Sequence, residues 1–288
     1  MLVKDTLFSK KKLLNCKGRL LDLNIPKVMA VINVTPDSFY KGSRCSTEDE
    51  IKKRVDQCIN EGADIIDTGA YSSRPGAADI PEHEEIKRLE KALDIIRKQA
   101  PDAVISIDTF RAKVAGWAVH NFDVNIINDI SGGEMDPDMI DTVAGLNVPF
   151  VVMHMKGTPQ TMQNNPFYSD VVKEIIAYFS AKTDVLLKAG IKDIIIDPGF
   201  GFGKTQEDNF TLLSNLEDFR IFAAPLLVGI SRKSMIYKTL GNTPDESLNG
   251  TTALHMAALM KGADILRVHD IKEAKEVVTL YGKMMDLS

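Results

Sequence analysis

The sequence predicts a single (β/α)8 TIM barrel domain over residues 1–288, and three observations support this prediction. The chain has 288 residues and 44% hydrophobic content, enough for a barrel of about 250 residues with a full core. Strand-like apolar runs alternate with helical patterns throughout, which implies a parallel sheet. A weak internal repeat, in which a strand follows a helix-ending glycine, recurs at 61–67, 189–197 and 261–267, so one βα unit is reused.

The main alternative is an open, doubly wound sheet. Such sheets usually carry a Gly-rich turn after their first strand, where a dinucleotide binds. Here the first strand is followed by Val34-Thr35-Pro36, which lacks that turn. The barrel is therefore favoured.

The N-terminal part, residues 1–27, is expected to form a tail and a short hairpin before the barrel proper at 28–285. Two short apolar runs flank Lys17-Gly18 within residues 13–27, which is the pattern of a small hairpin. A hairpin at this place in the chain would be able to plug the bottom of the barrel.

The barrel strands are expected where short, branched apolar runs end in a polar residue. Such runs occur eight times between the hairpin and the C-terminus. They span 28–34, 65–67, 104–108, 125–129, 150–154, 194–197, 226–231 and 265–269.

Helices are expected in the gaps between these strands. The first begins at a capping box that runs from Thr47 to Glu50 and ends before Gly62. The clearest of the later helices cover 82–98, 168–189 and 271–285. The buried face of the first helix is expected to consist of Ile51, Val55, Cys58 and Ile59.

Composition excludes several classes of protein. The formal charge is −5, and Lys and Arg are spread along the helices with acids between them, which argues against a nucleic-acid surface. No apolar run approaches the roughly 18 residues of a membrane span, and the charged start lacks the apolar stretch of a signal peptide. A cytoplasmic protein with no membrane association is expected. Cys16, Cys45 and Cys58 lack CxxC spacing, which argues against a disulfide framework or a structural zinc site.

The segment from Ile194 to Lys204, IIIDPGFGFGK, is the most informative stretch of the chain. Three branched aliphatic residues give way within one residue to Asp197, and an unpaired buried carboxylate costs several kcal/mol. A helix cap or a buried ion pair is the structural alternative to a binding role. The run also resembles a phosphate-binding loop, but Pro198 stands where that motif requires its first glycine.

The other strand ends favour a binding role, because the C-terminal ends of barrel strands meet at one site. Every predicted strand ends in an amide, carboxylate, imidazole, hydroxyl or cation, which helix capping alone does not explain. Carboxylates and an amide fit a planar heterocycle with amino and ring N–H groups, and cations fit an anion. These side chains are Asn33, Asp67, Asp108, Asn128, Asp129, His154, Asp197, Ser231, Arg232, Lys233, Arg267 and His269.

Seven motifs give the chain a specific resemblance. They are NVTPDSF at 33–39, SSRPGA at 72–77, SIDT at 106–109, IINDISG at 126–132, DPGFGFGK at 197–204, SRKS at 231–234 and RVHD at 267–270. From about residue 14 to 285, their order and spacing resemble the dihydropteroate synthase family, whose fold is a (β/α)8 barrel. The resemblance implies condensation of 6-hydroxymethyl-7,8-dihydropterin diphosphate with 4-aminobenzoate, giving 7,8-dihydropteroate and diphosphate in folate biosynthesis, with Mg2+.

The resemblance also implies roles for single residues and a homodimer that binds only small-molecule substrates. The catalytic residues would be Asp108, Asp197, Lys233 and Arg267. The pterin would be bound by Asp108, Asn128, Asp197 and Lys233, and the diphosphate by Asn33, Arg74, Arg267 and His269. Asn33 would also meet Mg2+, and Ser73, Pro75, Phe202 and Ser234 would shape the 4-aminobenzoate pocket.

Two departures and two alternatives accompany this resemblance. Many members read GGESTRPG where this chain has Ala70, Tyr71 and Ser73, and Lys41 and Ser43 replace residues that are often acidic or glycine.

One alternative is a pterin-binding barrel that transfers a methyl group from methyltetrahydrofolate to a corrinoid protein, which would not need the SRKS and RVHD motifs. The other is a non-catalytic pterin-binding paralogue, in which erosion of the diphosphate residues is expected.

Overall fold

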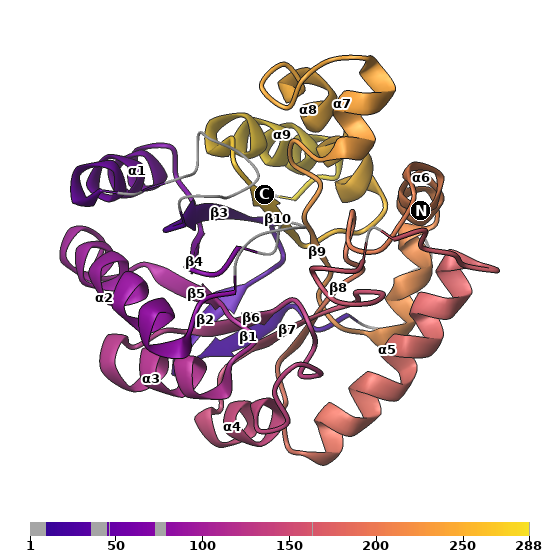
Figure 1. The fold of residues 1–288 in the computed structure, drawn as a ribbon. Helices are drawn as coiled ribbons and strands as arrows, with labels where there is room; N and C mark the ends of the chain where they lie inside the picture. Colours follow the sequence, from indigo (N-terminus) through magenta and orange to yellow (C-terminus); the bar gives the residue numbers. More distant parts are fainter. Residues whose placement is uncertain (1–9, 36–44, 46, 73–78, 163, 288) are drawn as a thin grey trace.

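The computed structural model describes residues 10–35, 45, 47–72, 79–162 and 164–287. Eight parallel strands surround the centre and helices form an outer ring (Figure 1). The hydrogen-bonded order is β8-β7-β6-β5-β4-β3-β10-β9, and a parallel bridge between Ile196 and Leu226 joins the first strand to the last. The predicted barrel is confirmed. The strands are β3 Lys27–Asn33, β4 Ile65–Gly69, β5 Val104–Asp108, β6 Ile126–Asp129, β7 Phe150–Met153, β8 Ile194–Asp197, β9 Leu227–Val228 and β10 Ile265–Val268.

The helices follow the strands in the order that the sequence predicts. Two of the connections are longer than a simple repeat, because a 3-10 helix, η3 Leu216–Phe222, precedes β9 and two helices precede β10. The α-helices are α1 Glu48–Asn60, α2 Glu82–Gln99, α3 Ala112–Phe122, α4 Met139–Leu146, α5 Val171–Lys188, α6 Gln206–Ser214, α7 Ser234–Leu240, α8 Leu248–Met260 and α9 Ile271–Met284. Among the described residues, none of these helices combines the length and the apolar character that a membrane crossing requires.

The core has two parts because successive residues of a strand face opposite sides. Val28, Ala30 and Ile32 of β3 belong to the large cluster between the sheet and the helices, whereas Met29 faces the barrel interior. The interior cluster contains the first residues of most strands, such as Ile65, Val104 and Ile126. The lower half of the barrel is therefore packed with apolar side chains.

The N-terminal hairpin closes this lower end. Strands β1 Leu13–Cys16 and β2 Arg19–Asp22 pair antiparallel around a turn at Lys17 and Gly18, both of which have positive φ. Apolar side chains of the hairpin, among them Leu14 and Leu23, belong to the same buried cluster as the strand starts. The predicted hairpin and its role as a plug are both confirmed.

The capping box of the first helix is confirmed, but the prediction that Ile59 belongs to the buried face of this helix is wrong. Thr47 Oγ1 accepts a hydrogen bond from Glu50 N at 3.3 Å, and Glu50 Oε2 accepts one from Thr47 N at 3.0 Å. Ile59 is 45% exposed. Arg54 is buried instead, because its guanidinium donates to the carbonyls of Val31 and His269. The buried face of α1 is thus turned toward the carboxyl ends of β3 and β10.

The seventh barrel strand is shorter than predicted. The expected run was 226–231, and the strand covers only Leu227–Val228. The chain then turns tightly, since Lys233 N donates to Ile230 O at 3.1 Å and Arg232 has a φ of 54°. The SRKS motif therefore lies on a turn that leads into α7.

Candidate active site

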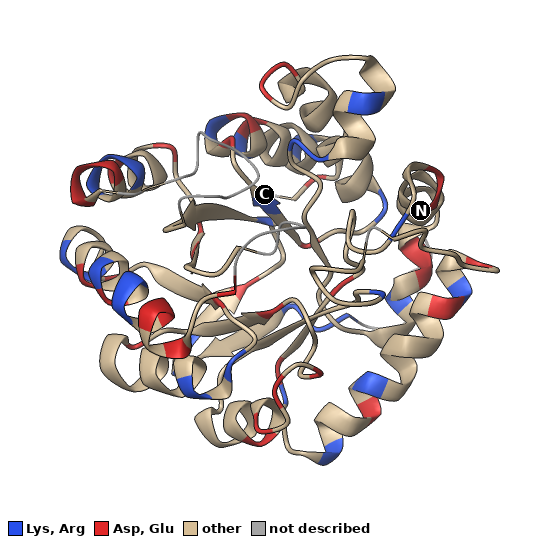
Figure 2. Ribbon diagram, viewed as in Figure 1, with Lys and Arg blue, Asp and Glu red and all other residues tan. Residues whose placement is uncertain are grey.

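The side chains at the strand ends gather at the end of the barrel opposite the hairpin plug. They come from parallel strands that all finish on this side (Figure 1). On α1, α2, α5 and α9, Lys and Arg occur together with Asp and Glu, so neither sign of charge dominates these outer helices (Figure 2). The concentrated polar groups of the barrel are thus at its carboxyl end.

Arg267 ties several strand ends together. Its Nε donates to Asp67 Oδ2 at 2.8 Å, and its Nη2 donates to Asp108 Oδ2 at 2.8 Å. Asn128 Nδ2 lies 3.3 Å and 3.4 Å from the two carboxylate oxygens of Asp67. One guanidinium therefore bridges two carboxylates, and an amide joins them at the centre of the barrel.

The charges in this cluster influence one another. Burial raises the pKa of Asp108, and Asp67 adds to that rise while Arg267 opposes it. Burial alone would lower the pKa of Arg267, but Asp67 and Asp108 raise it above its ordinary value. Arg267 therefore stays charged, and its neighbouring carboxylates share one positive group.

Asp197 and Lys233 form the second part of the site. Asp197 Oδ1 accepts a hydrogen bond from Gly199 N at 2.8 Å, and burial raises its pKa while Lys233 opposes the rise. Lys233 Nζ donates to the carbonyl of Phe200 and lies 4.8 Å from the centre of the Phe202 ring. Burial lowers the pKa of Lys233 to about 8. A carboxylate, an ammonium group and an aromatic ring therefore meet beside β8.

Two further residues expected at the diphosphate are Asn33, which ends β3, and His269, which directly follows β10. The backbone N–H of His269 donates to Ser231 Oγ at 3.2 Å, and its carbonyl accepts from Arg54 Nη2 at 2.8 Å. Burial and the neighbouring cation of Arg267 lower the pKa of His269, so its ring is neutral at pH 7. Asn33 is half-buried at the end of β3, and its carbonyl accepts from Cys45 N at 2.8 Å.

The residues expected at the second substrate are only partly described. Phe202 is half-buried beside Lys233, and Ser234 is the first residue of α7, directly after Lys233. These two predicted positions therefore adjoin the Asp197 side of the site. Ser73, Arg74 and Pro75 lie outside the described residues, as do most positions of the loop that contains Lys41 and Ser43.

Two of the polar residues that were predicted at strand ends, Asp129 and Arg232, stabilise loops. Both carboxylate oxygens of Asp129 accept hydrogen bonds from within its own loop, from Ser131 N and Oγ and from Gly133 N, each at 2.7 Å. Arg232 binds Asp270 with two bonds of 2.8 Å and also donates to the carbonyl of Pro244. These residues shape the loops around the site.

Sequence reasoning recognised Asp67 as a strand end but gave it no role. The structure gives it one, because its buried carboxylate binds both Arg267 and Asn128. The order of the strands around the barrel could have indicated this role of Asp67. Asp67, Asn128, Asp197 and Arg267 lie on β4, β6, β8 and β10, which are alternate strands of the barrel, and alternate strands contribute side chains to the same interior layer.

If this site binds Mg2+, the protein supplies only a small number of the metal ligands. Among the described residues, no group of three or more His, Cys, Asp and Glu side chains could hold a metal ion. Mg2+ commonly takes one or two protein oxygens and completes its shell with water and substrate phosphate. The carboxamide of Asn33 fits such a site as a single oxygen ligand.

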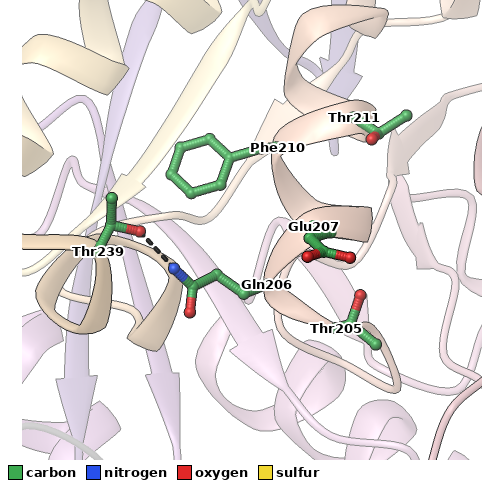
Figure 3. Close-up of a pocket in the computed structure, with 6 residues that line it drawn as sticks. All are labelled: Thr205, Gln206, Glu207, Phe210, Thr211 and Thr239. Carbon is green, nitrogen blue, oxygen red and sulfur yellow. Dashed lines mark hydrogen bonds between the residues drawn. The ribbon is translucent and has the colours of Figure 1, made fainter.

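A separate cavity of about 770 Å³ lies on the outer surface, away from the strand ends. It is formed between α6 and the end of α7, where Gln206 Nε2 donates to Thr239 Oγ1 at 2.6 Å (Figure 3). Its lining is mostly exposed and contains one carboxylate, Glu207. This surface lacks the convergent charged groups found at the barrel mouth.

The fold and the site define a barrel enzyme for small, polar and charged substrates. The family model described as "Pterin binding enzyme" matches residues 29–269, which is most of the barrel. The chain therefore belongs to the pterin binding enzyme family.

Relatives and solved structures define its place within that family. The chain is 41% identical over 264 residues to dihydropteroate synthase of Escherichia coli, covering 91% of this chain and 93% of the relative. It is 38% identical over 270 residues to that of Haemophilus influenzae, covering 93% and 97%. Its fold is similar to the Yersinia pestis synthase in complex with a sulfonamide drug, with a TM-score of 0.91, 36% identity, and coverage of 95% and 99%.

A second solved structure is that of Xanthomonas albilineans dihydropteroate synthase with 4-aminobenzoic acid. Its TM-score is 0.85 at 36% identity, and the match covers 95% of this chain and 98% of that one. The similarity to these proteins covers nearly the whole chain and includes the fold. Within the pterin binding family, the chain therefore groups with the dihydropteroate synthases, and the resemblance inferred from its motifs is confirmed.

Proposed function

We propose that this chain catalyses the dihydropteroate synthase reaction, in which 4-aminobenzoate displaces diphosphate from 6-hydroxymethyl-7,8-dihydropterin diphosphate. The observation that carries the proposal is the charge arrangement at the barrel mouth. Asp108 and Asp67 flank Arg267 on one side, and Asp197 adjoins Lys233 on the other. Such a pocket offers acceptors to a heterocycle and cations to an anion.

The pterin is assigned to the carboxylate side of the pocket. Asp197 and Asp108 accept from its amino and ring N–H groups, and Asn128 contributes its amide. Lys233 donates to the acceptor edge of the ring, at a position where its ammonium already meets the carbonyl of Phe200. The same carboxylates favour positive charge that develops on the pterin as diphosphate departs.

The diphosphate is assigned to Arg267, His269, Asn33 and Arg74. Among the described residues, Nη1 of Arg267 has no hydrogen-bond partner, and the side chain is 25% exposed. This leaves a donor for a phosphate oxygen without breaking the contacts to Asp67 and Asp108. When Mg2+ is bound beside Asn33, it supplies positive charge to the leaving group.

The second substrate is assigned to the side of the pocket next to Lys233. Phe202 would pack on the aromatic ring of 4-aminobenzoate, and Ser234, Ser73 and Pro75 would complete the pocket. An arylamine is neutral at pH 7, so the nucleophile needs no general base to become reactive. The chain's task in this step is to hold the amine in line with the departing diphosphate.

The decisive assay incubates the purified protein with the dihydropterin diphosphate, 4-aminobenzoate and Mg2+ and measures dihydropteroate. Product that requires both substrates is the expected result. The proposal would be overturned if this assay gave no dihydropteroate while the protein demethylated methyltetrahydrofolate in the presence of a corrinoid protein. The homodimer implied by the resemblance and the cytoplasmic location expected from the sequence are part of the same proposal, and sedimentation of the protein tests the dimer.

A further inference from the structure

Lys204 is a buried cation outside the groups assigned so far. It ends the DPGFGFGK motif, directly before Thr205, which caps α6. Its side chain extends back into the loop, and the residue is only 4% exposed. Nζ donates to the carbonyls of Gly199 at 2.9 Å and Phe202 at 3.0 Å, and lies 3.0 Å from Nδ1 of His154. An ammonium has three N–H donors, and each has a partner here.

The loop around Lys204, residues 199–203, is pressed against the segment that follows β7. A Cβ at Gly199 would lie 1.9 Å from the carbonyl oxygen of His154, and one at Gly203 would lie 2.5 Å from that of Lys156. Both glycines have positive φ, so no other residue fits either position without strain. Close packing of this kind turns carbonyls inward, where they need a donor.

The same loop carries atoms that form the active site. Its first N–H, from Gly199, donates to Asp197, and the carbonyl of Phe200 accepts from Lys233. The ring of Phe202 lies against Lys233, where the second substrate is proposed to bind. The shape of residues 199–203 therefore sets the relative positions of the Asp197 carboxylate, the Lys233 ammonium and the Phe202 ring.

The protonation states around Lys204 are consistent with a structural role in which its side chain donates hydrogen bonds to neutral acceptors. Burial, and the cation of Lys204 beside it, lower the pKa of His154 to about 3, so its ring is neutral at pH 7. Burial lowers the pKa of Lys204 itself to about 7, and Asp197 opposes that shift. Even a neutral amine keeps two N–H groups for the two loop carbonyls.

We infer that Lys204 is a positioning residue whose side chain holds the loop of residues 199–203 in the shape that builds the second-substrate side of the pocket. The inference rests on the proposed function, in which Phe202 contacts 4-aminobenzoate. Lys204 donates a hydrogen bond to the Phe202 carbonyl, whereas its interactions with Asp197 and Lys233 are between charges and not through hydrogen bonds. Loss of the ammonium should therefore weaken 4-aminobenzoate binding more than pterin binding.

The experiment compares Lys204→Met, Lys204→Arg and the unchanged enzyme by steady-state kinetics, with thermal denaturation alongside. Lys204→Met is expected to raise KM for 4-aminobenzoate at least tenfold and KM for the pterin diphosphate less than threefold. Lys204→Arg, which retains donors, should recover part of that loss. Lys156→Met is the control, because the ammonium of this exposed lysine donates to the Phe167 carbonyl and to Glu174 rather than to the carbonyls of residues 199–203.

A milder variant decides the matter if Lys204→Met does not fold. Tyr168→Phe removes only the hydroxyl that donates to Gly203 O at 2.8 Å, and should raise KM for 4-aminobenzoate severalfold in a folded enzyme. Wild-type KM values in folded Lys204→Met, or in Tyr168→Phe where the first variant is lost, overturn the inference. So does an equal rise for both substrates. An unchanged enzyme that makes no dihydropteroate overturns the proposed function instead.

Discussion

Buried carboxylates at the strand ends divide into two kinds according to their hydrogen bonds. Asp129 accepts three bonds from Ser131 and Gly133 in its own loop. Asp197 accepts one, from Gly199 N, among the described residues. A carboxylate has about four acceptor positions, so Asp197 keeps most of its capacity for a ligand and Asp129 does not. Burial alone does not distinguish the two.

This contrast gives a paired prediction for Asp197→Asn and Asp129→Asn. Asp197→Asn should weaken pterin binding by about 2–4 kcal/mol, because a charge-assisted bidentate contact becomes an amide contact with one donor misplaced. Asp129→Asn should lower the melting temperature but leave pterin affinity within a few fold. Calorimetric titration of both variants measures this. Wild-type pterin affinity in Asp197→Asn would remove that residue from the pocket.

A second prediction at the residue scale concerns pH. Burial lowers the pKa of Lys233 to about 8, so activity should fall as pH rises through about 8 and the donor to the pterin loses its charge. The folded pKa lies below the unfolded value of 10.5, so the unfolded chain binds more protons between these values. This group therefore adds stability as pH rises through that window, so its deprotonation lowers activity without itself promoting unfolding.

The pH prediction is checked by a kcat/KM profile with a melting curve at each pH. Asp197 and Arg267 face Lys233, and Lys204 influences Asp197, so a matched variant is needed to assign the fall in activity. Lys233→Arg keeps its charge above pH 8 and should lose the fall near that pH. A profile that keeps it would assign the titration to a neighbouring group.

At this scale the sequence predicted which residues end the strands, but it did not predict which side chains would bind one another. A polar residue after an apolar run marks a strand end, which is why Asp108, Asn128 and Asp197 were found. The partner of a side chain depends on which strands are neighbours and how they are staggered, and no local pattern carries that information. For this reason Asp67 and Lys204 were given no role from the sequence, although both are buried and hydrogen-bonded.

At the scale of elements, the most predictable features were those with a local cause. The capping box of α1 and the turn at Lys17-Gly18 depend on residues within a few positions of one another. The shortness of β9 was not predictable, since the turn at Ile230 to Lys233 is stabilised by distant groups. One of them is Thr251 on α8, whose hydroxyl accepts from Arg232 N at 3.1 Å.

The hairpin plug gives a prediction that separates stability from activity. Leu14 is fully buried among the strand starts, whereas Leu20 on the same hairpin is 67% exposed. Leu14→Ala should lower the free energy of unfolding by about 2–5 kcal/mol, and Leu20→Ala by less than about 0.5 kcal/mol. Both variants should keep wild-type KM values, because the plug lies at the opposite end from the site. Urea unfolding and steady-state kinetics test the pair, and a KM change in folded Leu14→Ala would contradict this separation.

At the scale of the whole molecule, the barrel assigns stability to one end and chemistry to the other. The apolar interior lies at the strand starts, and the charged cluster lies at the strand ends. Alternation of strands and helices is enough to predict this division, because parallel strands close with all carboxyl ends together. The Arg267 bridge to Asp67 crosses from β10 to β4, past β3. That contact requires closure of the barrel, which sequence periodicity implies but does not locate.

The last prediction concerns how the two substrates depend on each other. The pterin residues lie on strands held by backbone pairing and by the Arg267 bridge, so that part of the pocket is expected to be ready before binding. The loops at 34–44 and 69–79 carry several turn-forming residues and few apolar anchors. Part of the 4-aminobenzoate pocket is assigned to the second of them. We expect this ligand to bind weakly alone and about tenfold or more tightly with pterin, diphosphate and Mg2+, a coupling of roughly 1.4 kcal/mol.

Titration of labelled 4-aminobenzoate with and without the other ligands measures this coupling. Binding free energies are reciprocal, so 4-aminobenzoate must increase the affinity for the pterin and diphosphate pair by the same factor. A titration with pterin but no diphosphate is the control that separates filling of the pocket from the effect of the anion. Equal affinities for 4-aminobenzoate in all three titrations would mean that its pocket is complete in the free enzyme. The two loops would then act only to exclude water from the reaction.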